Sequence, residues 1–159
     1  MNAKKHSLLT STEVKIYDAL KKKLKPFYEV QSILKETNPS MKYSILVVKS
    51  GLKAAEYIKE VIEHNDLLIK IPYTRNYFLI IMQDKSIKES ILYGSQLASI
   101  INTKYMIKDK TRSDVKMSLI YVEHNTSLSH LVYEIIQTYK NLKNLSSIIH
   151  NLWVEIKKI

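Results

Sequence analysis

Three glutamates stand at helical spacing and could supply carboxylates for metal binding or for general acid–base catalysis. Glu56, Glu60 and Glu63 occupy positions i, i+4 and i+7 of a predicted helix. They lie beside Lys59 and opposite an apolar stripe, which is the placement of a solvated, charged helix face. We therefore interpret these carboxylates as surface charges.

The histidines offer a second set of candidates for acid–base or metal chemistry. His64 stands near Asp66, but the end of a helix followed by a turn accounts for both residues. His124 and His130 are six residues apart across a predicted helix start, which is not the spacing of a helical metal site such as HExxH. The chain has no nucleophile elbow and no cysteine, so thiolate catalysis, disulfides and cysteine zinc sites are excluded. We predict no catalytic residue, no metal and no cofactor.

The segment from Pro72 to Tyr77 is the most unusual polar stretch, and it connects two predicted strands. An aromatic and basic hairpin tip can stack on a base and pair with a phosphate, or contact a partner. The predicted contact residues are Tyr73, Thr74, Arg75, Asn76 and Tyr77. The alternative is an ordinary hairpin in which Tyr77 faces the core or a helix.

The elements that position these residues can be read from hydrophobic spacing and turn signals. Short apolar runs predict strands over 43–49, 67–71, 77–82 and 115–122, and helical spacing predicts helices over 52–64 and after Ser86. Residues 10–13 resemble a helix start, Pro26 should interrupt or restart that helix, and 103–114 should be a loop. The order β-α-β-β-α-β predicts an α+β, ferredoxin-like (split β-α-β) sheet of four antiparallel strands with two helices on one face.

We accordingly divide the chain into an N-terminal helical segment, 1–40, a core, 41–126, and a C-terminal helix, 127–159. The last segment has apolar residues at strict 3–4 spacing, and a continuous helix there would span roughly 50 Å. Either the helix breaks near residues 144–147, or its end projects. The apolar stripe of this segment either packs back on the N-terminal helices or, on a projecting helix, forms a dimer or partner site. The predicted interaction residues are Leu142, Leu145, Ile149, Leu152 and Ile156.

The formal net charge is +10, and only Arg75 and Arg112 among the 25 basic residues are arginine. Arginine supplies the bidentate fork that reads phosphates and guanine edges, so the composition is not typical of a dedicated nucleic-acid reader. A basic run consists of Lys21, Lys22, Lys23 and Lys25. It is either a solvated helix face or a patch for nucleic acid or an anionic surface.

The sequence contains no run of about 18 apolar residues, so we expect no membrane-spanning helix. Residues 1–6 are polar and basic, with no apolar signal region after them. We expect a cytoplasmic protein.

The element order resembles that of the GGDEF (diguanylate cyclase-like) domain over roughly residues 13–144. Residues 66–70 resemble the family's strand before the signature hairpin, and 73–82 look like the signature and its following strand, with Phe78 at the final Phe. Residues 116–121 are similar to the strand that usually reads "vSiG", and 126–143 resemble the closing helix, with Tyr139 at the family's Tyr.

This copy departs from the family at every functional motif. Thr74, Arg75, Asn76 and Tyr77 replace the signature's glycines and acids, and Val48 and Ser50 stand where the first strand should carry metal-binding aspartates. Phosphoryl transfer needs such carboxylates to hold its divalent metal. The segment after the first strand is also shorter than the family's, and the Arg of the product-inhibition motif is Glu63. The resemblance therefore implies that this chain neither makes cyclic di-GMP nor binds it at the position of the product-inhibition motif.

The function we expect is a non-enzymatic regulatory or protein-interaction module in signalling, with a protein partner or a homodimer formed through the terminal helices. The alternative is a nucleic-acid-binding module that uses the lysine-rich surface and the aromatic, basic hairpin tip.

Overall fold

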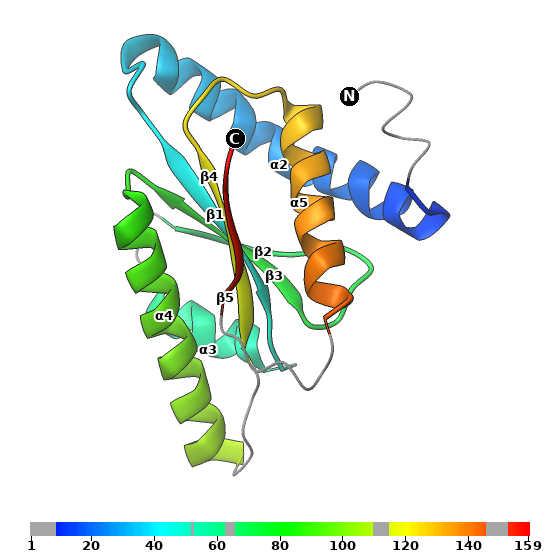
Figure 1. Ribbon diagram of the computed structural model, residues 1–159, viewed down its shortest axis with the longest axis vertical. Helices are drawn as coiled ribbons and strands as arrows, with labels where there is room; N and C mark the ends of the chain where they lie inside the picture. The colour runs from blue at the N-terminus through cyan, green and yellow to red at the C-terminus, as the bar shows by residue number, and fades with distance from the viewer. Residues whose placement is uncertain (1–8, 52, 63–65, 110–114, 146–152) are drawn as a thin grey trace.

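A single five-stranded mixed sheet, covered by helices on both faces, forms the centre of the molecule (Figure 1). The structure is a computed structural model that describes residues 9–51, 53–62, 66–109, 115–145 and 153–159. The strand order is β2-β3-β1-β4-β5. The strands are β1 (Tyr43–Lys49), β2 (Leu67–Lys70), β3 (Tyr77–Gln83), β4 (Lys116–Val122) and β5 (Trp153–Lys158).

The first four strands pair antiparallel, whereas β5 pairs parallel to β4. The predicted α+β class is confirmed, and the four predicted strands are present. The prediction of a sheet with only four antiparallel strands is wrong, because residues 153–158 add a parallel strand at the β4 edge.

The prediction of one continuous helix over residues 127–159 is also wrong, whereas the alternative of a break near residues 144–147 is confirmed by the end of the helix at Asn144. Helix α5 (Leu128–Lys143) begins at Ser127, whose hydroxyl accepts a hydrogen bond from the His130 N–H, and it ends at Asn144. The later segment contains an alternating, β-branched and aromatic run that suits a strand. Trp153 fixes this strand to the core by donating its indole N–H to Ser95 Oγ at 3.1 Å. The apolar residues of this segment fit both helical spacing and the alternation of a strand. The contacts with β4 and Ser95, which are distant in the sequence, favour the strand.

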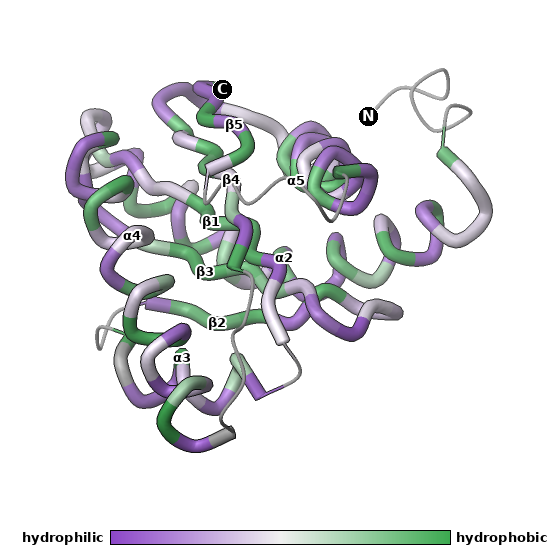
Figure 2. Tube along the Cα trace, turned by 60° about the horizontal axis from the view of Figure 1, so that its bottom comes forward, coloured by the Kyte–Doolittle hydropathy of each residue, from purple (hydrophilic) through white to green (hydrophobic). Residues whose placement is uncertain are grey.

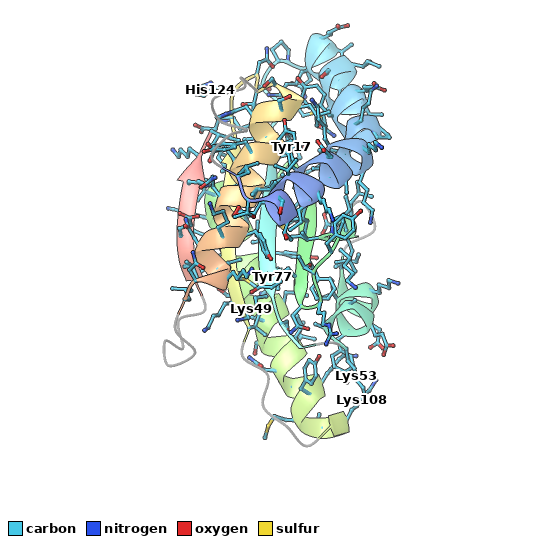
Figure 3. All side chains as sticks on the ribbon, turned by 90° about the vertical axis from the view of Figure 1, so that its right-hand side faces the viewer. Tyr17, Lys49, Lys53, Tyr77, Lys108 and His124 are labelled. Atoms are coloured by element: carbon cyan, nitrogen blue, oxygen red, sulfur yellow. The ribbon has the colours of Figure 1, made fainter. Side chains whose placement is uncertain are left out.

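One face of the sheet is covered by α5 and by α2 (Ser11–Thr37). Helix α2 starts at the predicted place, and its start has a capping box in which Thr10 and Glu13 each bond to the other's backbone N–H. Pro26 lies inside the helix and does not end it, although the two halves of α2 run in different directions in Figure 3. Helix α5 packs against α2, and Lys140 Nζ lies 3.4 Å from Glu13 Oε1. The described part of the C-terminal segment therefore packs back on the N-terminal helix.

The other face carries α3 (Ala54–Val61), α4 (Ile87–Lys104) and a π-helical turn, η1 (Tyr105–Asp109). The predicted loop is thus helical over residues 103–109. Gly94 is required where α4 crosses Trp153, because a Cβ at Gly94 would lie 2.6 Å from the indole ring. In Figure 2 the hydrophobic residues, drawn in green, follow β1 and β3 through the middle of the molecule.

Among the described residues, no helix has the length and apolar character needed to cross a membrane.

Candidate functional site

The hairpin tip, residues 73–76 between β2 and β3, presents one aromatic side chain to solvent. Tyr73 is 71% exposed and has a φ of 61°, in the left-handed region that few residues other than glycine adopt. Arg75 is exposed beside it. A bulky residue held in this conformation at an exposed turn is a departure from ordinary hairpin chemistry.

Hydrogen bonds hold the backbone of the tip in place on both sides. Thr74 Oγ1 donates to the Ile71 carbonyl at 2.6 Å, and the Ile71 N–H donates to the Tyr77 carbonyl at 3.1 Å. The Ser50 N–H, just after β1, donates to the Asn76 carbonyl at 3.0 Å. The end of β1 and the tip are therefore joined, and the backbone on both sides of Tyr73 is held by the fold.

Tyr77 faces the interior, as the ordinary-hairpin interpretation had it. Its ring packs edge-on against Tyr139 of α5, with centroids 4.8 Å apart, and Lys49 Nζ lies 5.9 Å from its centroid. Burial, together with the neighbouring Tyr139, raises the pKa of the Tyr77 hydroxyl. The side-chain oxygen of Asn76 is also buried, with no hydrogen-bond partner among the described residues. Of the five predicted contact residues, Tyr73 and Arg75 are the ones exposed to a partner.

The tip end of the sheet is basic. Lys49 is the last residue of β1 and Lys70 the last of β2, and neither strand has an acid. The connecting residues 71–76 contribute Arg75 and no acid. This end therefore suits an acidic surface or a phosphate.

The two positions that the resemblance assigns to lost metal ligands at the end of β1 hold Val48, fully buried, and Ser50, which is buried beside the tip. No cluster of three or more His, Cys, Asp or Glu suited to a metal ion occurs in the part of the chain that the structure describes.

The predicted helical interaction residues do not form one stripe. Leu142 is buried in the core between α5 and the sheet, and Leu145 lies beyond the end of α5. Ile156 is on β5 and is 43% exposed. Ile149 and Leu152 lie outside the described residues. The proposed helix-mediated dimer therefore lacks the continuous helix on which it depended.

The basic run lies on α2, where Lys22, Lys23 and Lys25 are exposed. Lys21 Nζ instead lies 5.9 Å from the centroid of Tyr17, on the chain's own surface. Other lysines repeat this arrangement: Lys49 over Tyr77, Lys85 over Tyr93, and Lys104 and Lys108 over Tyr57. Part of the positive charge is thus engaged with tyrosine rings of this chain.

Sequence reasoning missed a pocket of about 580 Å³ at the opposite end of the sheet, between the C-terminal half of α2 and the segment that joins β4 to α5. In Figure 3 His124, which lines the pocket, lies far from Lys49 and Tyr77. The available signal was Gln31, a polar residue in line with Leu24 and Phe27 on the buried stripe of α2. Spacing alone does not show what such a residue faces.

No family model and no curated protein matches the chain.

Proposed function

We propose that this chain is a non-catalytic regulatory module that contacts an acidic protein partner through Tyr73 and Arg75. The observation that carries the proposal is the conformation of Tyr73, whose left-handed backbone costs stability while its ring is left in solvent. The exposed ring of Tyr73 adds little packing to the chain itself that would offset this cost. A partner that buries the ring would gain an anchor of the kind that dominates protein interfaces, with arginine beside it.

We further propose that the scaffold holding the hairpin tip is a ferredoxin-like core. The order β2-β3-β1-β4, with α3 and α4 on one face, supports a ferredoxin-like core to which β5 adds a fifth strand. Derivation from a GGDEF-like domain whose acidic positions have been replaced is part of the proposal, and its support is the order of the elements along the chain. Signalling is the setting that this resemblance suggests. The chain should give no cyclic product when it is incubated with GTP and magnesium, and any product would refute the non-catalytic proposal.

The experiment that tests the contact compares three forms of the full chain as bait in a lysate of the cells from which the sequence comes. Tyr73→Gly removes the ring and relieves the backbone, and Arg75→Glu reverses the charge. Asp84→Gly is the matched control, because Asp84 is the other non-glycine residue with positive φ among the described residues, at 59°. A protein retained by the wild type and by Asp84→Gly, but lost with both tip variants, supports the proposal. Equal retention by all forms would refute it.

A nucleic-acid contact is the second candidate, favoured by the exposed Tyr73 and Arg75 together with the net charge of +10. Phosphate contacts weaken steeply with salt, so this candidate requires a gel shift with arbitrary DNA or RNA at low salt that disappears as salt is added. Nuclease treatment of the lysate separates the two candidates, because it abolishes retention only where nucleic acid bridges the bait and the retained protein.

A further inference from the structure

The pocket between α2 and the β4–α5 segment has the size of a small-molecule site. Its volume of about 580 Å³ falls within the range of roughly 300–1,000 Å³ that is common for ligand pockets. Figure 1 shows the segment after β4 passing beside the C-terminal half of α2 before α5 begins. Residues 28–39 of α2 and its end therefore form one wall, and residues 122–127 form another.

Gln31 supplies the observation that points to a ligand. It lines the pocket, is 3% exposed, and neither its Nε2 nor its Oε1 has a hydrogen-bond partner among the described residues. An amide buried in this state is unfavourable unless something else completes its hydrogen bonds. Its side chain offers a donor and an acceptor side by side, so the complementary group is a planar edge with a neighbouring acceptor and donor.

The rest of the lining provides a place for negative charge. Helix α5 has 16 residues and no acid in its first turn, and the residues just before it, 125–127, line the pocket, so the positive end of the helix dipole lies near it. Lys35 and His124 line the same pocket. Lys35 is half-buried, and burial lowers the pKa of its ammonium group; an anion beside it would favour the charged form and so offset the effect of burial. Glu36, the acid among the described lining residues, is exposed, where water weakens its repulsion.

Aromatic side chains complete the site. Tyr28 and Tyr43 both line the pocket, and the Tyr43 ring is fixed by an edge-on contact with Phe27 at 5.3 Å between centroids. Such rings provide flat contact area for a planar ligand.

We propose that this pocket binds a small anionic molecule, a phosphate or carboxylate with a planar edge that presents one hydrogen-bond donor next to one acceptor. The anion lies near Lys35, His124 and the start of α5, and the planar edge meets the amide of Gln31. This inference is independent of the hairpin-tip proposal, since the two sites lie at opposite ends of the sheet.

Titration calorimetry of the full chain with five probes tests the ligand class. Uridine 5′-monophosphate, adenosine 5′-monophosphate and orotate each combine an anion with the required edge, whereas uridine lacks the anion and inorganic phosphate lacks the edge. At least one of the first three should bind about tenfold more tightly than either uridine or phosphate. A preference for the monophosphates assigns the anion as phosphate, and a preference for orotate assigns it as carboxylate. The proposal is overturned if none of the three binds with a Kd below about 10 mM, or if phosphate alone binds as tightly as they do.

Variants of the full chain test the location. Gln31→Leu and Lys35→Met should each weaken the best probe by about tenfold or more, since each removes a group that the probe contacts. Lys22→Met is the matched control: Lys22 is exposed on the same helix and does not line the pocket. It should change the affinity by less than about twofold. Unchanged affinity in both Gln31→Leu and Lys35→Met, in proteins shown to be folded by circular dichroism, would place the binding elsewhere and refute the assignment.

Discussion

The hairpin tip and the pocket lie at opposite ends of the sheet, and they differ in where a cost to stability is located. At the tip the exposed Tyr73 carries the cost in its backbone, which is left-handed, although the side-chain oxygen of Asn76 is also buried there without a partner among the described residues. At the pocket it is in a side chain, because both polar atoms of the Gln31 amide are buried without partners among the described residues.

The difference separates two kinds of interaction. A strained turn directs a side chain outward and gains from a surface that covers it. A buried amide without partners gains from a molecule that enters the protein and completes its hydrogen bonds. Four experiments test whether the two ends of the sheet differ in this way.

The largest effect should come from Tyr77→Ala, at the first residue of β3 beside the tip. Removing a half-buried ring that packs against Tyr139 should reduce the free energy of unfolding by about 2–3 kcal/mol. Tyr73→Ala should change it by less than about 0.5 kcal/mol, because the Tyr73 ring is largely in solvent. Urea unfolding measures both, and equal losses would show that Tyr73 also has a packing role.

At the pocket end, Gln31→Leu should raise the free energy of unfolding by about 1 kcal/mol. Leucine has a similar volume and removes two buried polar atoms that lack partners. The control is Gln96→Leu on the exposed side of α4, which should be close to neutral. A destabilised Gln31→Leu protein would mean that the amide is satisfied in solution, and the contrast between the two ends would then disappear.

Relief of the tip backbone should have a smaller effect. Tyr73→Gly should raise the free energy of unfolding by about 0.5–1 kcal/mol, since glycine adopts positive φ without the Cβ clash. Asp84→Gly should give a smaller gain, because aspartate tolerates this region better than tyrosine does. Thermal unfolding compares the pair; a loss of stability in Tyr73→Gly would show that the backbone there is not strained.

The smallest effect should be the loss of stability at alkaline pH, which should differ between the two ends of the sheet. Burial raises the pKa of Tyr43 at the pocket and, less strongly, that of Tyr77 beside the tip. A tyrosine with a raised folded-state pKa contributes stability that is complete below its unfolded pKa of about 10 and is lost as pH rises towards the folded value. For each of these two tyrosines, the resulting loss in the free energy of unfolding should be less than about 1 kcal/mol at pH 10.5.

Urea midpoints between pH 8 and pH 10.5 measure this loss. Tyr43→Phe should flatten the pH dependence more than Tyr77→Phe, since the Tyr43 hydroxyl is the more deeply buried. The reverse order would contradict the assignment of the stronger burial to the pocket end.

Local patterns predicted much of the scaffold. The β-branched runs marked four strands, and the Ser and Thr residues among 10–13 marked the start of α2, because such signals act within a few residues. The strand at Trp153–Lys158 was missed because its apolar residues also fit helical spacing. Its pairing with β4 and its contact with Ser95 involve residues more than 30 positions away.

The sites were predictable only in part for the same reason. The turn residues located the hairpin, but the inward direction of Tyr77 depends on Tyr139 of α5. The pocket requires α2 to meet residues 122–127, and no local signal in Gln31 specifies that meeting. The positive φ of Tyr73 could not be predicted from the sequence either, because tyrosine is not typical of the left-handed region.

The end of β5 has a consequence for the exchange of amide hydrogens with solvent. Ile159 donates its N–H to the Tyr121 carbonyl at 2.9 Å, and its own carbonyl accepts from the N–H groups of Glu123 and His124 at 2.9 and 3.5 Å. Opening of the last strand therefore exposes amides of the segment that lines the pocket. The Glu123 amide should exchange with the same opening free energy as the β5 amides, so local unfolding of β5 and loosening of the pocket wall are one event.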